Sequence, residues 1–388
     1  MQKRTIYTFI AIGVLAAALV FAFFWNVRQK AAPVLPTPIP TLMPFETPTA
    51  LPTPAPTPTA APLKSTTFEL PLKGATGFAS VALNLRAGAS ASSQLLKALS
   101  PGDAFLILGE AGDWLHVRVG DADGYLYARY CLINLPDIVP SIVYNATNTY
   151  SSILHSSGKE IPGITGVGLY PGKQENARLG TRAFIMPVLY PMAQKINAAQ
   201  KAALKNGETL VLYEAYRPYD VQMTIVRALQ KLANSDQTVM AGISSAPWAL
   251  SWFASTRLSN HQRGGAVDVS LAKVTQTEEK RAGAYGYTIV AGSTNYDMPT
   301  PMHELSEAAA TFTGPVSGSS RTAWKSATLS KSMNAPAKRL QKYMTDAGLT
   351  PLASEWWHFN DLDALEATSA DKSTGKYILT SVVSEAPF

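Results

Sequence analysis

Hydrophobic residues are distributed along the chain in four patterns, and the first is a continuous apolar run. From Thr5 to Trp25 the chain has 21 uncharged, mostly apolar residues. As a helix rising ~1.5 Å per residue, this run is roughly 31 Å long, close to the thickness of the bilayer core. Residues 1–30 are therefore predicted to form a single-pass anchor in the cell membrane, with the following domains outside the cell. A cleavable signal peptide, which would release the protein, is the alternative.

The second pattern is a proline-rich segment. Eleven of the 27 prolines lie between Pro33 and Pro62, interleaved with threonine and alanine. Proline fixes the backbone angle φ and lacks an N–H donor, so such a segment stays extended and unpacked. We predict an extended linker over residues 31–72. About 30 such residues at ~3.1 Å each reach on the order of 90 Å from the membrane.

The third pattern, over residues 73–136, is an alternation of apolar and polar residues in short runs. Four runs have the length of strands: Val81–Leu85, Phe105–Leu108, Trp114–Val119 and Gly124–Tyr127. Segments rich in proline, glycine and aspartate separate them. Short strands at this spacing predict a small all-β barrel.

Several segments of this region resemble bacterial SH3 domains. They are Leu83-Asn84-Leu85-Arg86-Ala87-Gly88, Pro101-Gly102-Asp103, Gly112-Asp113-Trp114-Leu115-His116-Val117 and Gly124-Tyr125-Leu126, in this order. The resemblance implies an SH3-like domain that binds cell-wall peptides, or one that only spaces its neighbours.

The fourth pattern, from residue 137 to residue 388, mixes helical and strand periodicities. Helices are predicted over residues 192–206, 220–234 and 334–347, and a strand over residues 209–215. Gly207 and Gly348 are placed to end the first and last of these helices, and Asn334 is placed to cap the last one. Because helices and strands do not alternate regularly, the pattern predicts an α+β domain with an antiparallel sheet.

Charge and cysteine content narrow the possible functions. The net charge is +6, but Lys3, Arg4, Arg28 and Lys30 flank the first apolar run, and subtracting these four charges leaves only +2. A nucleic-acid groove needs clustered lysine and arginine, so no nucleic-acid partner is expected. Cys131 is the single cysteine, so no disulfide can form within the chain and any metal must be held by histidine and carboxylate.

A histidine and an aspartate frame the strongest chemical motif, Ser259-Asn260-His261-Gln262-Arg263-Gly264-Gly265-Ala266-Val267-Asp268-Val269. Gly264 and Gly265 disfavour a continuous helix, so the histidine and the aspartate can meet only if the chain turns between them. Valines then alternate with Asp268 in a strand, which puts the carboxylate on the opposite face from the valines. Burying a carboxylate is costly unless it binds a cation.

A second motif, Ser354-Glu355-Trp356-Trp357-His358-Phe359, supplies further groups for hydrolysis. In this strand-like run, residues three apart would point to opposite faces unless the strand is bulged or strongly twisted. With His358 as a third protein ligand, a zinc ion keeps one position open for water, whose pKa it lowers to about 7. Glu355 would take a proton from that water and pass it to the leaving amine.

A third motif, Glu214-Ala215-Tyr216-Arg217-Pro218, follows the strand predicted over residues 209–215. A guanidinium stays charged and offers several donors. Arg217 could therefore neutralise the oxyanion that develops on a scissile carbonyl.

In this order, the three motifs resemble those of zinc D-Ala-D-Ala peptidases, most closely the vancomycin-resistance type D-alanyl-D-alanine dipeptidases, over roughly residues 142–360. The resemblance implies a Zn²⁺ ion bound by His261, Asp268 and His358, with Glu355 as acid/base residue and Arg217 as oxyanion stabiliser. It also implies a D,D-dipeptidase or D,D-carboxypeptidase that acts on D-Ala-D-Ala or on peptidoglycan stem peptides.

The chain departs from this family at one position. His303 stands where the family's Met-Gly-Thr-x-Phe-Asp stretch has its aspartate. In the dipeptidases that aspartate holds the substrate's free ammonium, together with a serine two residues before the first ligand, here Ser259. A histidine has no fixed negative charge, so longer stem peptides are favoured over the free dipeptide. Ser259 and His303 are candidate substrate-binding residues.

Two other functions stay open at this point. A peptidoglycan endopeptidase would cut another bond of the stem peptide with the same groups. A wall-binding protein without activity would keep the peptidase fold, although it would have no need for Glu355.

Overall fold

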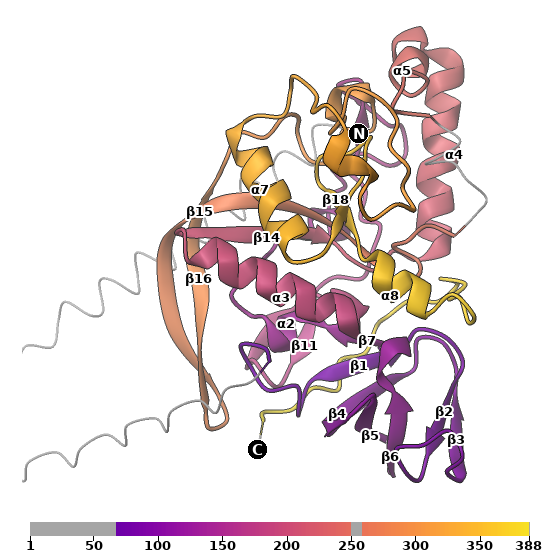
Figure 1. Cartoon of the computed structure of the whole chain (residues 1–388), viewed down its shortest axis with the longest axis vertical. Helices are drawn as coiled ribbons and strands as arrows, with labels where there is room; N and C mark the ends of the chain where they lie inside the picture. The colour runs from indigo at the N-terminus through magenta and orange to yellow at the C-terminus, as the bar shows by residue number, and fades with distance from the viewer. Residues whose placement is uncertain (1–66, 250–257, 388) are drawn as a thin grey trace, which may run out of the picture. The chain divides into compact units, whose positions relative to one another are not determined.

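The computed structural model describes residues 67–249 and 258–387 (Figure 1). The predicted anchor and the proline-rich part of the linker lie outside the described residues. Within the described part of the chain, no helix is both long and apolar enough to cross a bilayer.

The first part of the described chain is all-β, as predicted. Its strands are β1 (Thr76–Ala79), β2 (Leu83–Arg86), β3 (Leu95–Leu99), β4 (Ala104–Ala111), β5 (Trp114–Val119), β6 (Ala122–Tyr127) and β7 (Cys131–Asn134). The strands pair antiparallel in the order β7-β1-β4-β5-β6-β2-β3, and Leu115, Val117 and Leu126 point into the core. We refer to this unit as the barrel.

The rest of the described chain is a mixed domain built on a second sheet. The sheet has the order β17 (Thr350–Pro351), β18 (His358–Asn360), β15 (Ala266–Ala282), β14 (Glu208–Glu214) and β8 (Val143–Tyr144), and β16 (Tyr285–Asn295) pairs with the far part of β15. Its pairings are antiparallel except for β14 with β8. The expectation of an α+β domain with antiparallel pairing is therefore confirmed.

Helices lie around this sheet. The longer ones are α3 (Tyr190–Leu204), α4 (Tyr219–Ser235) and α7 (Ala335–Asp346), and the shorter ones are α2 (Leu135–Ile138), α5 (Gln237–Gly242) and α8 (Leu362–Ala367). Helices α3 and α7 pack against each other and against β14 and β15 (Figure 1). In the part of the chain that the structure describes, four short 3₁₀ turns and two small hairpins, β9–β10 (His155–Ser156, Lys159–Glu160) and β11–β12 (Gln174–Asn176, Thr181–Ala183), complete the connections.

Predicted boundaries of helices and strands agree closely with the observed ones where local signals are strong. The three predicted helices and the strand over residues 209–215 differ by one or two residues from α3, α4, α7 and β14. Asn334 caps α7 by accepting a hydrogen bond from the backbone N–H of Ala337 at 3.2 Å. Gly207 and Gly348 have φ angles of +69° and +91°, which favour glycine at the ends of helices.

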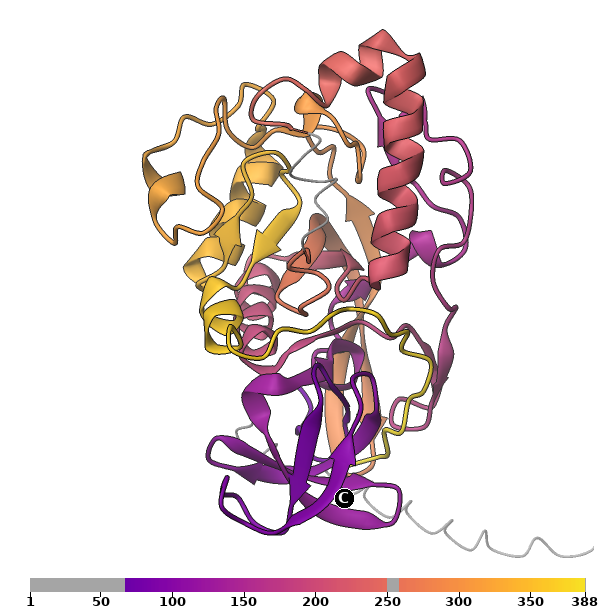
Figure 2. The ribbon, with the colours of Figure 1, turned by 90° about the vertical axis from the view of Figure 1, so that its right-hand side faces the viewer.

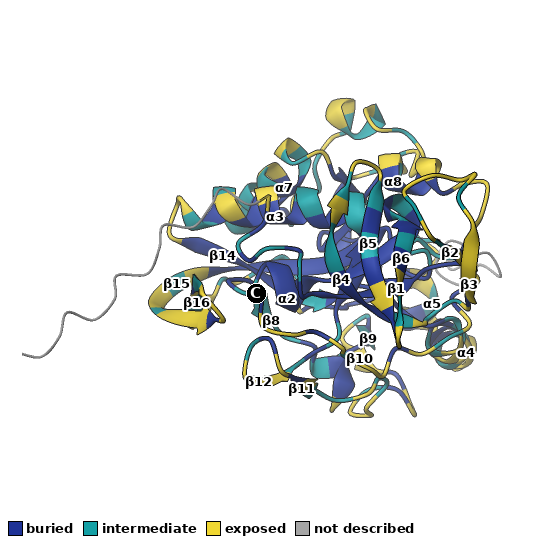
Figure 3. Ribbon diagram, turned by 90° about the horizontal axis from the view of Figure 1, so that it is seen from below, coloured by how far each residue is buried: buried dark blue, intermediate teal, exposed yellow. Residues whose placement is uncertain are grey.

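The barrel and the mixed domain share a sheet. Strand β13 (Pro187–Leu189), which directly precedes α3, pairs antiparallel with β7 of the barrel, so that Val188 lies opposite Ile133. One cluster of buried apolar side chains runs through both parts and includes Leu115 of the barrel and Ile196 of α3. Figure 3 shows this buried interior, in contrast to the exposed far end of the β15–β16 hairpin.

A buried arginine joins three segments that are far apart in sequence. Arg178 is 1% exposed, and its guanidinium donates to the backbone carbonyl oxygens of Asp137 and Lys73 at 2.8 Å each. It also donates to the carbonyl oxygens of Pro71 and Glu385. Glu385 belongs to the C-terminal tail, residues 369–387, which runs along the barrel to the end of the chain (Figure 2). The arginine therefore clamps the tail and the segment before β1 onto the mixed domain.

Replacing Arg178 with methionine should lower the free energy of unfolding by about 2–4 kcal/mol, because several carbonyl oxygens lose a charged donor. Urea denaturation followed by tryptophan fluorescence measures the change. Arg182→Met is the matched control, since its side chain is 61% exposed and pairs only with the 83% exposed Glu175 among the ion pairs of the described residues. Equal midpoints for the two variants would contradict a clamping role for Arg178.

Candidate metal and catalytic site

Three side chains from separate parts of the chain meet at one point of the second sheet. The Nε2 atom of His261 lies 3.1 Å from Nδ1 of His358 and 3.2 Å from Oδ1 of Asp268. The Nδ1 atom of His358 lies 3.0 Å from the same Oδ1. All three residues are buried. The structure thus brings together the three residues that the sequence motifs single out as metal ligands.

Sheet register accounts for much of this convergence. Asp268, near the start of β15, lies directly opposite His358 on β18 and opposite Glu214 at the end of β14. The functional side chains therefore gather where three adjacent strands begin or end. The antiparallel pairing of β15 with β18 thus puts Asp268 opposite His358, although the two residues are 90 positions apart in sequence.

His261 reaches the same point through a tight turn. The backbone N–H groups of Gly264 and Gly265 donate to the carbonyl oxygens of His261 and Asn260, at 3.0 and 2.9 Å. Gly264 has a φ angle of +72°, and a Cβ atom there would lie 2.3 Å from the side chain of Leu132. A Cβ atom on Gly265 would lie 2.5 Å from Leu365. The predicted turn between the histidine and the aspartate therefore needs both glycines.

Each imidazole has one nitrogen that faces away from Asp268, and the hydrogen bond of this nitrogen determines which ring nitrogen carries the proton. Nδ1 of His261 lies 2.7 Å from the carbonyl oxygen of Ala215, which can only accept, so this nitrogen is the donor. Nε2 of His358 lies 3.0 Å from Oδ1 of Asn360, which also accepts from Asn260. In the neutral imidazoles, the nitrogens that face Asp268 are consequently lone-pair acceptors.

Three acceptor atoms at these distances form a suitable cradle for a cation. In tetrahedral zinc sites, bonds of about 2.0–2.1 Å place the ligand atoms roughly 3.3 Å apart. The three observed separations of 3.0–3.2 Å are close to this value. Two imidazole nitrogens and one carboxylate oxygen are also a ligand set typical of zinc. The residues present therefore fit a zinc ion.

The electrostatics of the cluster also favour positive charge. Burial disfavours the ionised carboxylate, but the three neighbouring imidazoles hold the pKa of Asp268 well below its usual range. Burial lowers the pKa of His261. Burial acts in the same direction on His358, but the hydrogen bond and negative charge of Asp268 outweigh it and raise the pKa of that imidazole.

Glu355 lies beside this cluster because the chain turns just before β18. Its Oε2 atom is 3.9 Å from Nδ1 of His358, and the backbone N–H of His358 donates to the carbonyl oxygen of Glu355 at 3.3 Å. The expected strand-like run over residues 354–359 is wrong in part, since only residues 358–360 are a strand. A turn, and not a bulge, puts the two side chains on the same side. Burial raises the pKa of Glu355 to about 7, so it can exchange a proton near neutral pH.

Arg217 follows β14 and borders the cluster from another side. Its Nη2 atom donates to Oδ2 of Asp268 at 3.0 Å, and its Nη1 atom donates to Oε1 of Gln222 at 2.6 Å. The guanidinium also forms a buried ion pair with Glu214, whose other oxygen accepts from the hydroxyl of Tyr170. Burial alone would lower the pKa of Arg217, but the charge of Glu214 raises it well above its usual value.

The two candidate substrate-binding residues have different surroundings. His303 is 1% exposed, and its ring nitrogens contact Oδ2 of Asp268 at 3.3 Å and Nδ2 of Asn148 at 3.2 Å. Ser259 is half-buried, and its Oγ atom makes no hydrogen bond to the described residues. Within residues 67–249 and 258–387 the serine hydroxyl therefore has no hydrogen-bond partner, whereas both ring nitrogens of the histidine have one.

Several polar residues of the site carried no recognisable signal in the sequence. Asn148, Gln222 and Asn360 each contact one of the charged or aromatic groups described above, but no motif singles them out. Glu214 stands in the same motif as Arg217, and its pairing with that arginine three residues later is the one contact of this group that spacing could have suggested.

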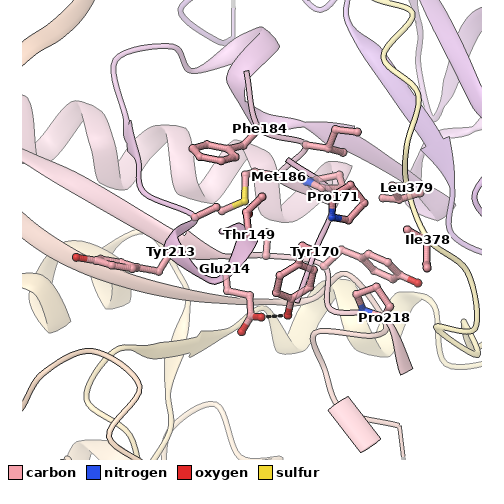
Figure 4. A pocket seen from close by; sticks show the side chains of 15 residues that line it. Thr149, Tyr170, Pro171, Phe184, Met186, Tyr213, Glu214, Pro218, Ile378 and Leu379 are labelled. Carbon is pink, nitrogen blue, oxygen red and sulfur yellow. Dashed lines mark hydrogen bonds between the residues drawn. The ribbon is translucent and has the colours of Figure 1, made fainter. Parts of the chain in front are cut away.

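A mostly apolar pocket adjoins the cluster at Glu214 (Figure 4). It lies between residues of the 146–149, 170–171 and 184–187 segments, the end of β14, and Ile378 and Leu379 of the C-terminal tail. Among the described residues that line this pocket, Glu214 alone is charged, and it accepts a hydrogen bond from the hydroxyl of Tyr170.

Comparisons with known proteins agree with this geometry. Residues 186–375 match the family model described as D-ala-D-ala dipeptidase, and residues 81–131 match the model of the bacterial SH3 domain. All three motifs lie inside the first match. No curated protein matches the chain. The resemblances drawn from the motifs are confirmed, and the first match supports a metallopeptidase that acts on cell-wall peptides.

Proposed function

We propose that this chain, which carries a D-ala-D-ala dipeptidase family domain over residues 186–375, hydrolyses D-Ala-D-Ala-type bonds in peptidoglycan stem peptides with the help of zinc. In this proposal His261, Asp268 and His358 hold the ion. The observation that carries the proposal is that three acceptor atoms lie 3.0–3.2 Å from one another with a buried carboxylate beside them.

Each remaining group of the site has a chemical task in this reaction. A zinc ion at the cluster would supply a Lewis acid that activates a water molecule. Glu355, whose pKa burial raises to about 7, accepts a proton from that water and delivers it to the leaving amine. Arg217 keeps its positive charge next to Asp268 and stabilises the negative charge that develops on the scissile carbonyl oxygen.

The surroundings of His303 favour longer substrates over the free dipeptide. A free D-Ala-D-Ala molecule carries an ammonium group close to the bond that is cut, and a buried ammonium needs a negative partner. His303 offers no fixed negative charge, and both its nitrogens already contact Asn148 and Asp268. Among the described residues the hydroxyl of Ser259 has no partner, and it suits a neutral peptide group. We therefore propose D,D-carboxypeptidase action on stem peptides as the main activity.

The proposed location follows from the N-terminal third of the chain. Residues 1–30 would anchor the protein in the cell membrane, and the proline-rich linker would hold the described domains in the wall outside it. The bacterial SH3 domain would contribute by binding wall peptides. This arrangement would keep the hydrolase close to the layer in which new stem peptides are exposed.

Glu355→Gln should lower kcat for release of D-alanine from a pentapeptide stem by about 10²–10⁴-fold, because the amide cannot accept the proton from water. Bound zinc, measured by elemental analysis, should stay unchanged. Glu160→Gln, on the exposed β10, is the matched control and should have normal activity. If wild type and Glu355→Gln release no D-alanine but both bind wall material, the chain is a binding protein.

Removal of zinc should abolish hydrolysis, and added zinc should restore it. The wild-type chain should bind about one tightly held zinc ion. His261→Ala should weaken zinc binding by more than the roughly 10–100-fold typical of changes outside the ligand shell. His116→Ala, a half-buried histidine on β5 of the barrel, should bind zinc as wild type does. Full activity of a metal-free preparation would refute the proposed chemistry.

The pentapeptide stem should be cleaved with a kcat/KM at least about tenfold higher than that of free D-Ala-D-Ala. The expected factor corresponds to one missing charge-assisted hydrogen bond, about 1.5 kcal/mol. Competition between the two substrates in one reaction, followed by chromatography, measures the ratio. A higher kcat/KM for the bare dipeptide would show that an ammonium site exists elsewhere in the cleft.

A further inference from the structure

A chain of hydrogen bonds leads from the backbone to the side of Asp268 that faces away from the two metal-binding imidazoles. It begins at the backbone N–H of Ile153, which donates to Oδ1 of Asn148 at 3.1 Å. A backbone N–H can only donate, so the amide orientation of Asn148 is determined and its Nδ2 atom is the donor toward His303. The contact between Nδ2 of Asn148 and Nδ1 of His303 is 3.2 Å long.

The same reasoning determines the tautomer of His303. Because Nδ1 accepts from Asn148, the neutral imidazole carries its proton on Nε2. Nε2 lies 3.3 Å from Oδ2 of Asp268, so the histidine donates to this carboxylate oxygen. Arg217 donates to the same oxygen at 3.0 Å. Two donors thus hold Oδ2, and Oδ1 is left to face the imidazoles of His261 and His358.

The backbone and the neighbouring rings hold His303 in this position. Its φ angle is +61°, in the left-handed region that residues other than glycine rarely adopt. The carbonyl oxygen of His303 accepts from the N–H of His155 at 3.1 Å, and the ring lies edge-on to Tyr213 and Trp357 with centroids 6.2 and 6.0 Å away. Such a conformation persists where the surroundings determine it, and it is common at functional sites.

We propose that His303 is a positioning residue for the metal site: through the Asn148–His303–Asp268 hydrogen bonds, it orients the carboxylate of Asp268 so that Oδ1 alone faces the zinc position. The inference deepens the proposed function and rests on it. It gives His303 a different task from the substrate contact expected from the sequence, because the buried imidazole directs its one N–H at the metal ligand.

Two substitutions of similar size separate this role from a purely steric one. Glutamine carries an Nε2 donor at about the reach of the imidazole Nε2, whereas methionine has a similar length without a donor. Both replacements meet the same left-handed backbone and bear the same steric cost, so the difference between them reports the hydrogen bond. Zinc affinity is measured on the full chain by competition with a fluorescent chelator.

His303→Met should raise the zinc Kd about 10–100-fold, the usual effect of losing a partner of a metal ligand. His303→Gln should stay within about threefold of wild type, since it restores the donor to Asp268. Circular dichroism and thermal unfolding establish that both variants are folded. Equal zinc affinities of the two variants, whether high or low, would overturn the proposal.

A measurement on the wild-type chain tests the same inference without any substitution. The protein has five histidines, and ¹⁵N labelling of their rings distinguishes the two neutral tautomers by NMR. The signal of His303 should show a protonated Nε2 and an unprotonated Nδ1, and the opposite tautomer would refute the hydrogen-bond chain. If wild type binds no zinc, the proposed function itself fails. If wild type binds zinc and releases D-alanine while both variants match it, only the role of His303 fails.

Discussion

The candidate site depends on one constraint: three electron-pair donors must point at a common position, although they repel each other. The structure meets this constraint with a hydrogen bond to the other polar atom of each of the three groups. The carbonyl oxygen of Ala215 accepts a hydrogen bond from His261, Oδ1 of Asn360 accepts one from His358, and Arg217 donates to Oδ2 of Asp268. Each candidate ligand atom is thus directed at the common position by a hydrogen bond to the other polar atom of the same group, as is usual for partners of metal ligands.

Much of the fold was predictable because its signals are local. Apolar periodicity located α3, α4 and α7, and glycines with positive φ angles end two of these helices. Strand β3 was missed because only Leu99 of its five residues is buried, so it shows no alternation of apolar and polar positions. The sharing of β13 with the barrel was also missed, since nothing in Pro187–Leu189 indicates which sheet a short apolar strand will join.

The residues of the candidate site differ in the same way: some could be predicted from their neighbours in the sequence, and others have partners far away in the sequence. The two glycines of the first motif predicted the turn between His261 and Asp268, whereas the turn that puts Glu355 beside His358 was not predicted, because residues 354–359 have the pattern of a strand. The surroundings of His303 were not accessible to such reasoning. Its partner Asn148 lies 155 positions earlier in the sequence, and an isolated asparagine in a loop has no pattern that distinguishes it. A residue identical in type could equally have lined the cleft, and only the fold shows where its N–H points.

Strand β13 and the clamp made by Arg178 join the barrel to the mixed domain. Because the two parts share a sheet and a buried core, moving one against the other would have to break the β13–β7 pairing and open that core. A ligand bound to the barrel would therefore stay at a nearly constant distance and orientation relative to the candidate site.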